Sequence, residues 1–261
     1  MKREMSVCGS FYPCRSIELE KYFEHFSAVY DESFSLPQLN SKIIIVPHAG
    51  YVYSGYTANI AYRILQKSEI KKFVVIGPSH KVAFEGVSLC NFNSYETPCD
   101  DIKSADDIAQ KLKDNFSINC FETAHAEHST EVQFPFIKHY IPDAEIIELV
   151  YSQIDAEYLS DIMSFILSQD DCGLIISTDL SHFYENEKAK KLDMVCLESI
   201  ERLDLELLHK GCEACGVIGV KALMLSAKKH SLSSHLLDYR TSAELSKDTS
   251  SVVGYMSACF V

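Results

Sequence analysis

The chain has 261 residues, of which 47% are hydrophobic and 23% are charged, so its composition is that of a globular protein rather than a disordered one. Its formal net charge of −13 argues against general binding to nucleic acid or to an anionic membrane, because both depend on clustered Lys and Arg side chains. Residues 1–13 lack the apolar core of a signal peptide, and no run reaches about 18 apolar residues. We therefore expect a cytoplasmic protein without membrane spans.

Ten cysteines are scattered along the chain. Without a secretory signal, we expect a chain of this size to keep them as reduced thiols, most of them small residues of the core. No repeat of fixed period and no low-complexity linker divides the sequence, so we predict a single domain over residues 1–261.

Short runs rich in Ile and Val alternate with longer segments whose apolar residues recur every three or four positions, the patterns of strands and amphipathic helices. In chain order they predict a helix over 18–30, a strand over 42–46, a helix over 57–66, a strand over 73–76, a helix over 105–115, a strand over 145–150, a helix over 157–168, a strand over 174–177, helices over 187–209 and 216–229, and a closing strand over 251–261. Gly211 is expected to end the helix of 187–209 in the left-handed conformation. Runs that are apolar throughout suit strands covered on both faces. The order therefore predicts an α/β fold, a three-layer α/β/α sandwich around a mostly parallel or mixed central sheet.

Histidines follow three of the predicted strands, shortly after each strand ends. His48 follows the strand of 42–46, His80 follows that of 73–76, and His182 follows that of 174–177. A lone histidine in such a place is usually a surface or hydrogen-bonded residue, but the carboxyl ends of parallel strands form the ligand crevice of open α/β sheets. Since neutral imidazole is a common ligand of zinc, copper and iron, three histidines in equivalent positions predict a functional cluster.

A second group of polar residues occupies positions 124–131, which read Ala-His-Ala-Glu-His-Ser-Thr-Glu. His128 and Glu131 are three residues apart and share one face if the segment is helical. They could hold a metal, orient a ligand histidine from behind, or simply belong to a solvated helix start.

Cys212 and Cys215 form a Cys-x-x-Cys pair, which could be a redox dithiol or half of a zinc site. A zinc ribbon needs a second such pair and the chain has none, and a thioredoxin-like motif follows a first strand rather than lying late between helices. A single thiolate donated to a metal by Cys215 fits better, with Cys212 uninvolved.

Several of these segments together resemble one family over most of the chain. The matching motifs are Gly9-Ser10-Phe11-Tyr12-Pro13, Val46-Pro47-His48-Ala49-Gly50-Tyr51-Val52-Tyr53-Ser54-Gly55, Ile76-Gly77-Pro78-Ser79-His80, Glu127-His128-Ser129-Thr130-Glu131, Ser177-Thr178-Asp179-Leu180-Ser181-His182, Ala214-Cys215-Gly216 and Val252-Val253-Gly254-Tyr255. They are similar to the motifs of Memo-like proteins, called AmmeMemoRadiSam system protein B in bacteria and archaea. The resemblance implies a fold related to the LigB-type class III extradiol dioxygenases, which use non-haem Fe(II).

The resemblance also implies roles for particular residues. His48, His80 and Cys215 would be the ligands of one transition-metal ion, iron(II) foremost, with copper or zinc as alternatives because a thiolate favours such metals over hard cations. His182 would be the acid–base residue with Asp179 beside it to fix its tautomer. His128 or Glu131 would support a ligand from behind.

Three functions remain open from the sequence. The first is a dioxygenase-like, metal-dependent oxidoreductase, the second is a zinc-type hydrolase, and the third is a non-catalytic peptide-binding or signalling protein with a vestigial site. The expected ligand is an unknown small molecule or peptide, and the resemblance adds a functional link to a radical SAM protein; no nucleic acid or membrane partner is expected.

Overall fold

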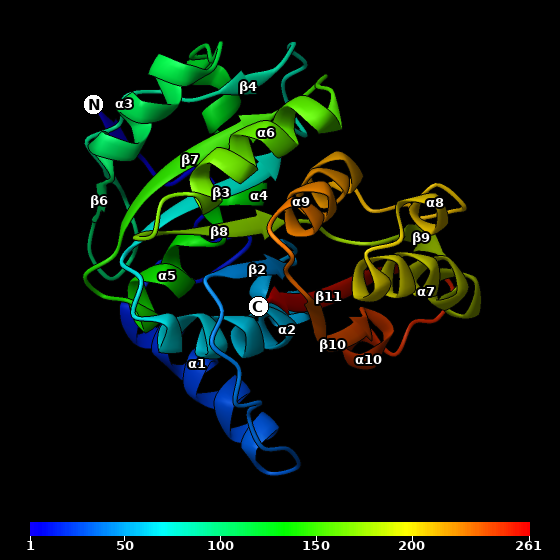
Figure 1. The fold of residues 1–261 in the computed structure, drawn as a ribbon. Coiled ribbons are helices and arrows are strands. Elements are labelled where there is room, and N and C mark those ends of the chain that lie inside the picture. Colours follow the sequence, from blue (N-terminus) through cyan, green and yellow to red (C-terminus); the bar gives the residue numbers. More distant parts are fainter.

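The computed structural model describes residues 1–261, and an 11-stranded mixed sheet forms its centre. The strand order is β1-β5-β6-β7-β3-β8-β2-β11-β10, with β4 paired to β7 and β9 paired to β11 outside this path. Figure 1 shows helices on both sides of this sheet. The predicted α/β sandwich is therefore confirmed.

The centre of the sheet consists of the four strands predicted from the Ile- and Val-rich runs. They are parallel and adjacent in the order β7 (Glu145–Tyr151), β3 (Lys72–Pro78), β8 (Cys172–Ser177) and β2 (Ile43–Val46). Every residue of β2 and β8 is buried, as expected for strands covered on both faces. The closing strand β11 (Val252–Phe260) pairs antiparallel with β2 and makes the sheet mixed.

Alternate residues of the central strands point into two separate cores. Ile43, Ile45 and Val74 pack with α6 (Ala156–Leu167) and α9 (Val217–Lys229) on one face. On the other face, Ile44, Val46 and Phe73 pack with three helices, namely α1 (Ser16–Asp31), α2 (Tyr51–Leu65) and α5 (Phe134–Tyr140). The two cores give the three layers.

The long helix predicted for 187–209 is divided. Helix α7 (Asn186–Arg202) ends at Leu203, whose φ of 51° is left-handed, and a short helix α8 (Leu205–Leu208) follows. The prediction that Gly211 caps this helix was therefore wrong. The side chain of Asp204 accepts hydrogen bonds from the Glu206 and Leu207 N–H groups, so it starts a new helix where the old one would have continued.

Helix α3 (Asp106–Asn115) matches its prediction. Several further elements were not predicted from the sequence. The helices among them are η1 (Gln66–Ser68), η2 (Glu122–His125), α4 (His128–Glu131) and α10 (Ala243–Ser246). The strands are β1 (Lys2–Arg3), β4 (Val87–Ser88), β5 (Ser94–Tyr95), β6 (Ile102–Ser104), β9 (His182–Tyr184) and β10 (Ser234–Thr241). Of these strands, β1, β5 and β6 lie at one edge of the sheet and β10 lies at the other, while β4 and β9 pair with β7 and β11.

Six of the ten cysteines form disulfides, so the expectation of ten reduced thiols was wrong. The pairs are Cys8–Cys14, Cys90–Cys120 and Cys196–Cys212. The fold brings each pair to a Cα separation of 4.7–5.2 Å, within the range that a disulfide spans, and composition alone cannot reveal such proximity. Cys212 is bonded to Cys196 of α7, so it is not a free thiol beside Cys215.

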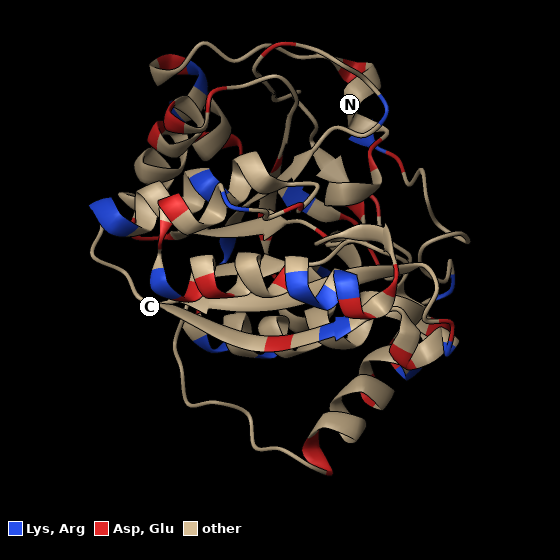
Figure 2. Ribbon diagram, turned by 90° about the vertical axis from the view of Figure 1, so that its right-hand side faces the viewer, with Lys and Arg blue, Asp and Glu red and all other residues tan.

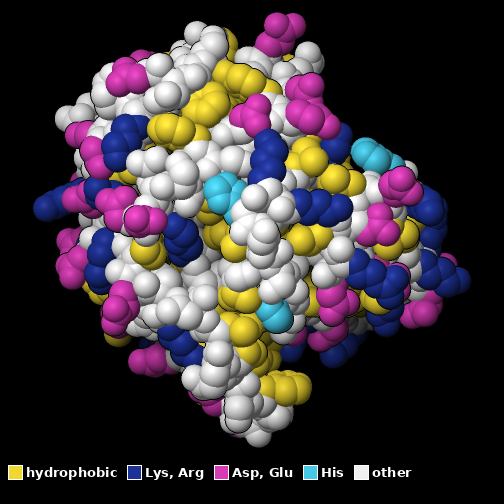
Figure 3. Space-filling model, in the orientation of Figure 1, with side chains coloured by type: hydrophobic (Ala, Val, Ile, Leu, Met, Phe, Trp, Pro, Cys, Tyr) yellow, Lys and Arg dark blue, Asp and Glu magenta, His cyan; other side chains and the backbone are white.

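No helix is both long and apolar enough to cross a membrane. Lys and Arg residues are interspersed with Asp and Glu along the helices of the ribbon in Figure 2, and the space-filling view in Figure 3 shows the same mixture of charged side chains on one face. The charges on these faces therefore form no extended basic patch of the kind that binds polyanions.

Candidate metal site

The carboxyl ends of three adjacent strands place the first two histidines of the site. Strands β3, β8 and β2 are neighbours in this order and point the same way in Figure 1. His48 follows β2 and His80 follows β3, so the turns after these strands bring both imidazoles over the end of β8. Their ring centroids are 5.1 Å apart.

His128, the first residue of α4, completes a cluster of three histidines. Its ring centroid lies 4.5 Å from that of His80 and 5.3 Å from that of His48. Each imidazole offers a nitrogen, and these three nitrogens all lie within 4.8 Å of one another. The cluster could therefore hold a metal ion.

Glu127 holds two of these histidines from behind. Its carboxylate lies 3.1 Å from Nδ1 of His80 and 2.8 Å from Nδ1 of His128, and it also accepts the backbone N–H of His80. Burial alone would raise the pKa of Glu127, but the hydrogen bonds from His128 and His80 outweigh burial and hold the pKa far below its ordinary value. An ionised carboxylate on Nδ1 leaves Nε2 of each ring free to act as a ligand.

His48 is buried and is positioned by polar groups of two neighbouring segments. Its Nδ1 lies 3.0 Å from the Ser177 hydroxyl, and its backbone N–H donates to Asp179 at 2.7 Å. Burial and the nearby His80 and His128 lower its pKa well below the ordinary value, so the ring is neutral. Its remaining nitrogen, Nε2, lies 3.2 Å from Sγ of Cys215.

Cys215 reaches the site from the loop between α8 and α9. Its sulfur accepts the Asp179 N–H at 3.3 Å, and the next N–H, of Gly216, donates to the Thr178 hydroxyl at 2.9 Å. A Cβ at Gly216 would come within 2.8 Å of Thr178, so the close approach of this loop to the end of β8 requires glycine. Burial, followed by the charge of Asp179, raises the pKa of the Cys215 thiol to about 12.

The predicted acid–base residue His182 and its predicted partner Asp179 lie near the cluster, but no hydrogen bond or ion pair joins them. Asp179 is buried, which raises its pKa to about 6, and its carboxylate accepts the His48 N–H rather than a hydrogen bond from His182. His182 begins β9, is half-buried, and neither of its ring nitrogens hydrogen-bonds to another residue. The predicted contact that fixes the His182 tautomer through Asp179 is therefore absent.

The two carboxylates of segment 127–131 have different partners, and the one that contacts the histidines is not the predicted one. Glu131 touches no histidine; its carboxylate accepts hydrogen bonds from the N-terminal segment, including the backbone N–H groups of Ser6 and Val7 and the Tyr12 hydroxyl. The support predicted for Glu131 is supplied by Glu127, which sequence reasoning missed. The available signal was its position next to His128, at the N-cap of a short helix.

A cavity of about 520 Å³ lies next to the cluster, between the N-terminal turn and the start of α2. Its lining includes Phe11, whose ring lies 4.8 Å from that of His128, and also Val52 and Tyr53, which are exposed. Phe183, the residue after His182, is 78% exposed. Phe11 is therefore the residue that lines this cavity and also contacts the histidine cluster.

The donor set fits one transition-metal ion. Zinc-like bond lengths of about 2.0–2.1 Å to nitrogen and about 2.3 Å to sulfur would place two such donors about 3.5 Å apart, close to the observed separation of His48 Nε2 and Cys215 Sγ. Imidazole together with thiolate suits iron, copper and zinc rather than magnesium or calcium. The site thus defines an α/β protein with a nitrogen- and sulfur-lined cluster at the carboxyl edge of its sheet.

Comparison with known proteins assigns the family. The model of the family described as Memo-like protein matches residues 3–259. A MEMO1 family protein of Thermoplasma acidophilum is 33% identical over 270 residues, which cover 98% of both chains. Those of Aquifex aeolicus and Methanobrevibacter smithii are 31% and 33% identical and cover at least 99% of both chains. The chain belongs to the Memo family.

Proposed function

We propose that this Memo-family protein is a mononuclear metal-dependent oxidoreductase related to the extradiol dioxygenases. Its iron or copper ion would be held by His48, His80 and Cys215, with His128 as a further donor. The observation that carries the proposal is the convergence of three imidazoles and one thiol from four separate segments, with one nitrogen of each imidazole within 4.8 Å of the others and Nε2 of His48 at 3.2 Å from the thiol sulfur. Imidazole nitrogens and a thiol sulfur brought together in this way suit a transition-metal ion.

A redox-active ion with open coordination positions would supply activation of O₂ or of a substrate oxygen. The protein itself would contribute the remaining functions. His182 has two free ring nitrogens beside the cluster and would accept or donate a proton, which is typically worth about 10²–10⁴-fold in rate. Asp179 would fix the turn that carries His48, and Phe11 would cover the ring of His128.

The first test removes two ligands together. The double variant H48A/H80A should lose stoichiometric iron or copper while remaining folded, because neither side chain supports the cores. Metal content would be measured by elemental analysis after anaerobic purification, with H209A/H230A, two histidines outside the site, as the matched control. Full retention of metal in H48A/H80A would reject the site.

X-ray absorption on the same samples identifies the metal and counts sulfur ligands. We expect one sulfur ligand in the wild-type protein and none in C215S. A colourless, zinc-only protein that hydrolyses esters or amides would instead support the hydrolase alternative, since two histidines and one cysteine form a known catalytic zinc set. Absence of any bound metal in the wild-type protein would favour a peptide-binding role.

A further inference from the structure

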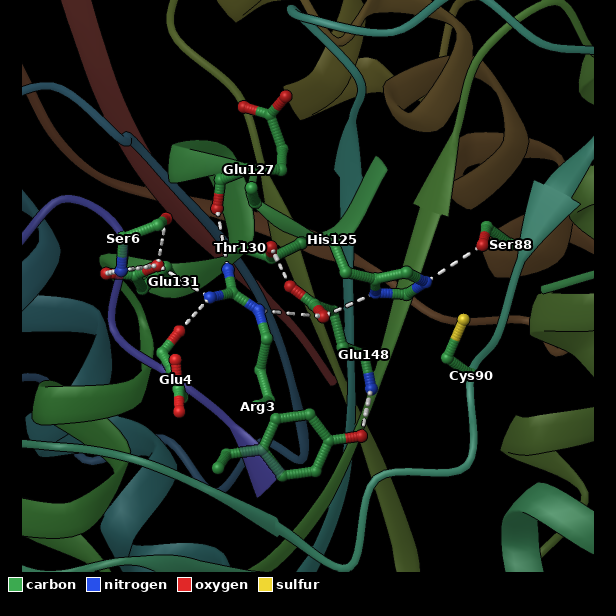
Figure 4. Close-up of polar contacts among 12 residues, drawn as sticks. Arg3, Glu4, Ser6, Ser88, Cys90, His125, Glu127, Thr130, Glu131 and Glu148 are labelled. Atoms are coloured by element: carbon green, nitrogen blue, oxygen red, sulfur yellow. Dashed lines mark hydrogen bonds and ion pairs between the residues drawn. The ribbon is translucent and has the colours of Figure 1, made fainter. Parts of the chain in front are cut away.

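The N-terminal strand carries a buried arginine that contacts the segment bearing His128. Arg3 is only 5% exposed, and Figure 4 shows its guanidinium among the carboxylates of Glu131 and Glu148. Its Nη1 lies 2.9 Å from Glu131 and its Nε lies 3.5 Å from Glu148. A planar guanidinium presents donors in several fixed directions at once, whereas a lysine offers a single point of charge.

The same guanidinium contacts both ends of α4. Nη2 donates to the backbone carbonyl of Glu127 at 3.2 Å, and Nη1 pairs with the Glu131 carboxylate at the last residue of the helix. Helix α4 has only four residues, so its own hydrogen bonds cannot fix its position. External contacts must therefore hold it, and Arg3 supplies one at each end.

The opposite face of α4 approaches the end of β3 closely. A Cβ at Gly77 would lie 2.5 Å from the Ser129 hydroxyl, and that hydroxyl donates to the Pro78 carbonyl at 2.8 Å. Helix α4 thus contacts both the end of β3 and the side chain of Arg3. A shift of the helix moves His128 directly and moves the Glu127 carboxylate away from both Nδ1 atoms.

We infer that Arg3 is a positioning residue for the histidine cluster, which acts by clamping α4 so that Glu127 and His128 face His80. This inference rests on the proposed metal-binding function for its consequence, although the clamp itself does not need a metal. Arg3 touches none of the three histidines, so its effect passes through α4.

The test uses R3K, which keeps the charge but cannot reach Glu127 and both carboxylates together. R63K is the matched control, because Arg63 also pairs with a carboxylate, Asp31, at 2.9 Å but makes no hydrogen bond or ion pair with α4. Cobalt(II) affinity, measured by competition with a chromophoric chelator, should fall about 10-fold in R3K, the lower end of the range for groups behind metal ligands. R63K should match the wild-type protein.

A second measurement separates clamping from general loosening. In an H128A background the loss caused by R3K should shrink below about threefold, because the main residue through which Arg3 acts is gone. An equal loss in both backgrounds, or wild-type affinity in a folded R3K protein, would overturn the inference.

A third measurement works on the metal-free protein. The hydrogen-bonded Nδ1–H proton signals of His80 and His128 in the NMR spectrum should shift in R3K and stay unchanged in R63K. If the wild-type protein bound no cobalt, the proposed function would fail while these signals would still decide the clamp. Unchanged signals in R3K would reject it.

Discussion

Two polar clusters meet at α4, the histidine cluster of His48, His80 and His128 and the Arg3 cluster of Arg3, His125, Thr130, Glu131 and Glu148, and they differ in what their polar atoms are paired with. In the Arg3 cluster, opposite charges pair with one another. The carboxylate of Glu148, for example, contacts Arg3, His125 and Thr130. In the histidine cluster, Nδ1 of His80 and Nδ1 of His128 both face Glu127, while His48 lies between Ser177 and Cys215. One nitrogen of each of the three rings lies within 4.8 Å of the other two.

The difference separates a structural cluster from a ligand site. The Arg3 cluster pairs opposite charges with one another, although Nε of Arg3 is buried without a hydrogen bond of its own. The histidine cluster brings together groups of like character, an arrangement that suits a transition-metal ion. Burial alone does not distinguish the two clusters, because both contain fully buried residues; the kind of group that each brings together does.

The largest expected effect is on the stability of the paired cluster. R3M should destabilise the fold by about 3–5 kcal/mol at neutral pH, because it leaves Glu131 and Glu148 buried without their positive partner. Urea unfolding measures this, and R63M, at a more exposed ion pair, should cost less than about 1 kcal/mol. Equal losses in the two variants would mean that the Arg3 cluster is no more than another surface pair.

This destabilisation should depend on pH. Burial acts to raise the pKa of Glu148, but Arg3 and His125 outweigh it and hold the pKa below its ordinary value of 4.5. A lowered pKa in the folded protein contributes stability above pH 4.5 that is lost as the pH falls through the folded pKa. The difference between R3M and wild type should therefore be full at pH 7 and shrink below about pH 4.5; a constant difference would contradict this account.

The next effect concerns the link between the two clusters. E127Q keeps the size of the side chain but removes the charge that both Nδ1 atoms face, so cobalt(II) affinity should fall about 10–100-fold. Chelator competition measures it, and E122Q, an exposed neighbour in η2, serves as control. An E127Q protein that binds as tightly as the wild type would show that the histidines are positioned without Glu127.

The smallest effect concerns Phe183, the residue after His182. Phe183 has a φ of 63°, a left-handed conformation that destabilises a bulky residue, and its side chain is too exposed for burial to offset this strain. F183N should stabilise the fold by up to about 1 kcal/mol in urea unfolding, because asparagine tolerates the left-handed region. E69N, at another exposed residue with a φ of 61°, should give a similar gain. A destabilised F183N would show that the ring makes contacts that stabilise the fold.

The sequence by itself determined the central strands and singled out His48 and His80, because a continuous apolar run and the turn that follows it are local features. It singled out Cys215 through the Cys-x-x-Cys pair and the family resemblance. It also determined the family, since the motifs recur in one order along the chain. The tertiary structure alone decided that Cys215 reaches His48, that cysteines pair in three disulfides, and that Glu127 rather than Glu131 supports the histidines. Residues 127 and 131 belong to one short segment. Which of their carboxylates faces the imidazoles depends on how the contacts with β3 and Arg3 orient that segment. Contacts between residues far apart in the chain set that position, so no local pattern could reveal it.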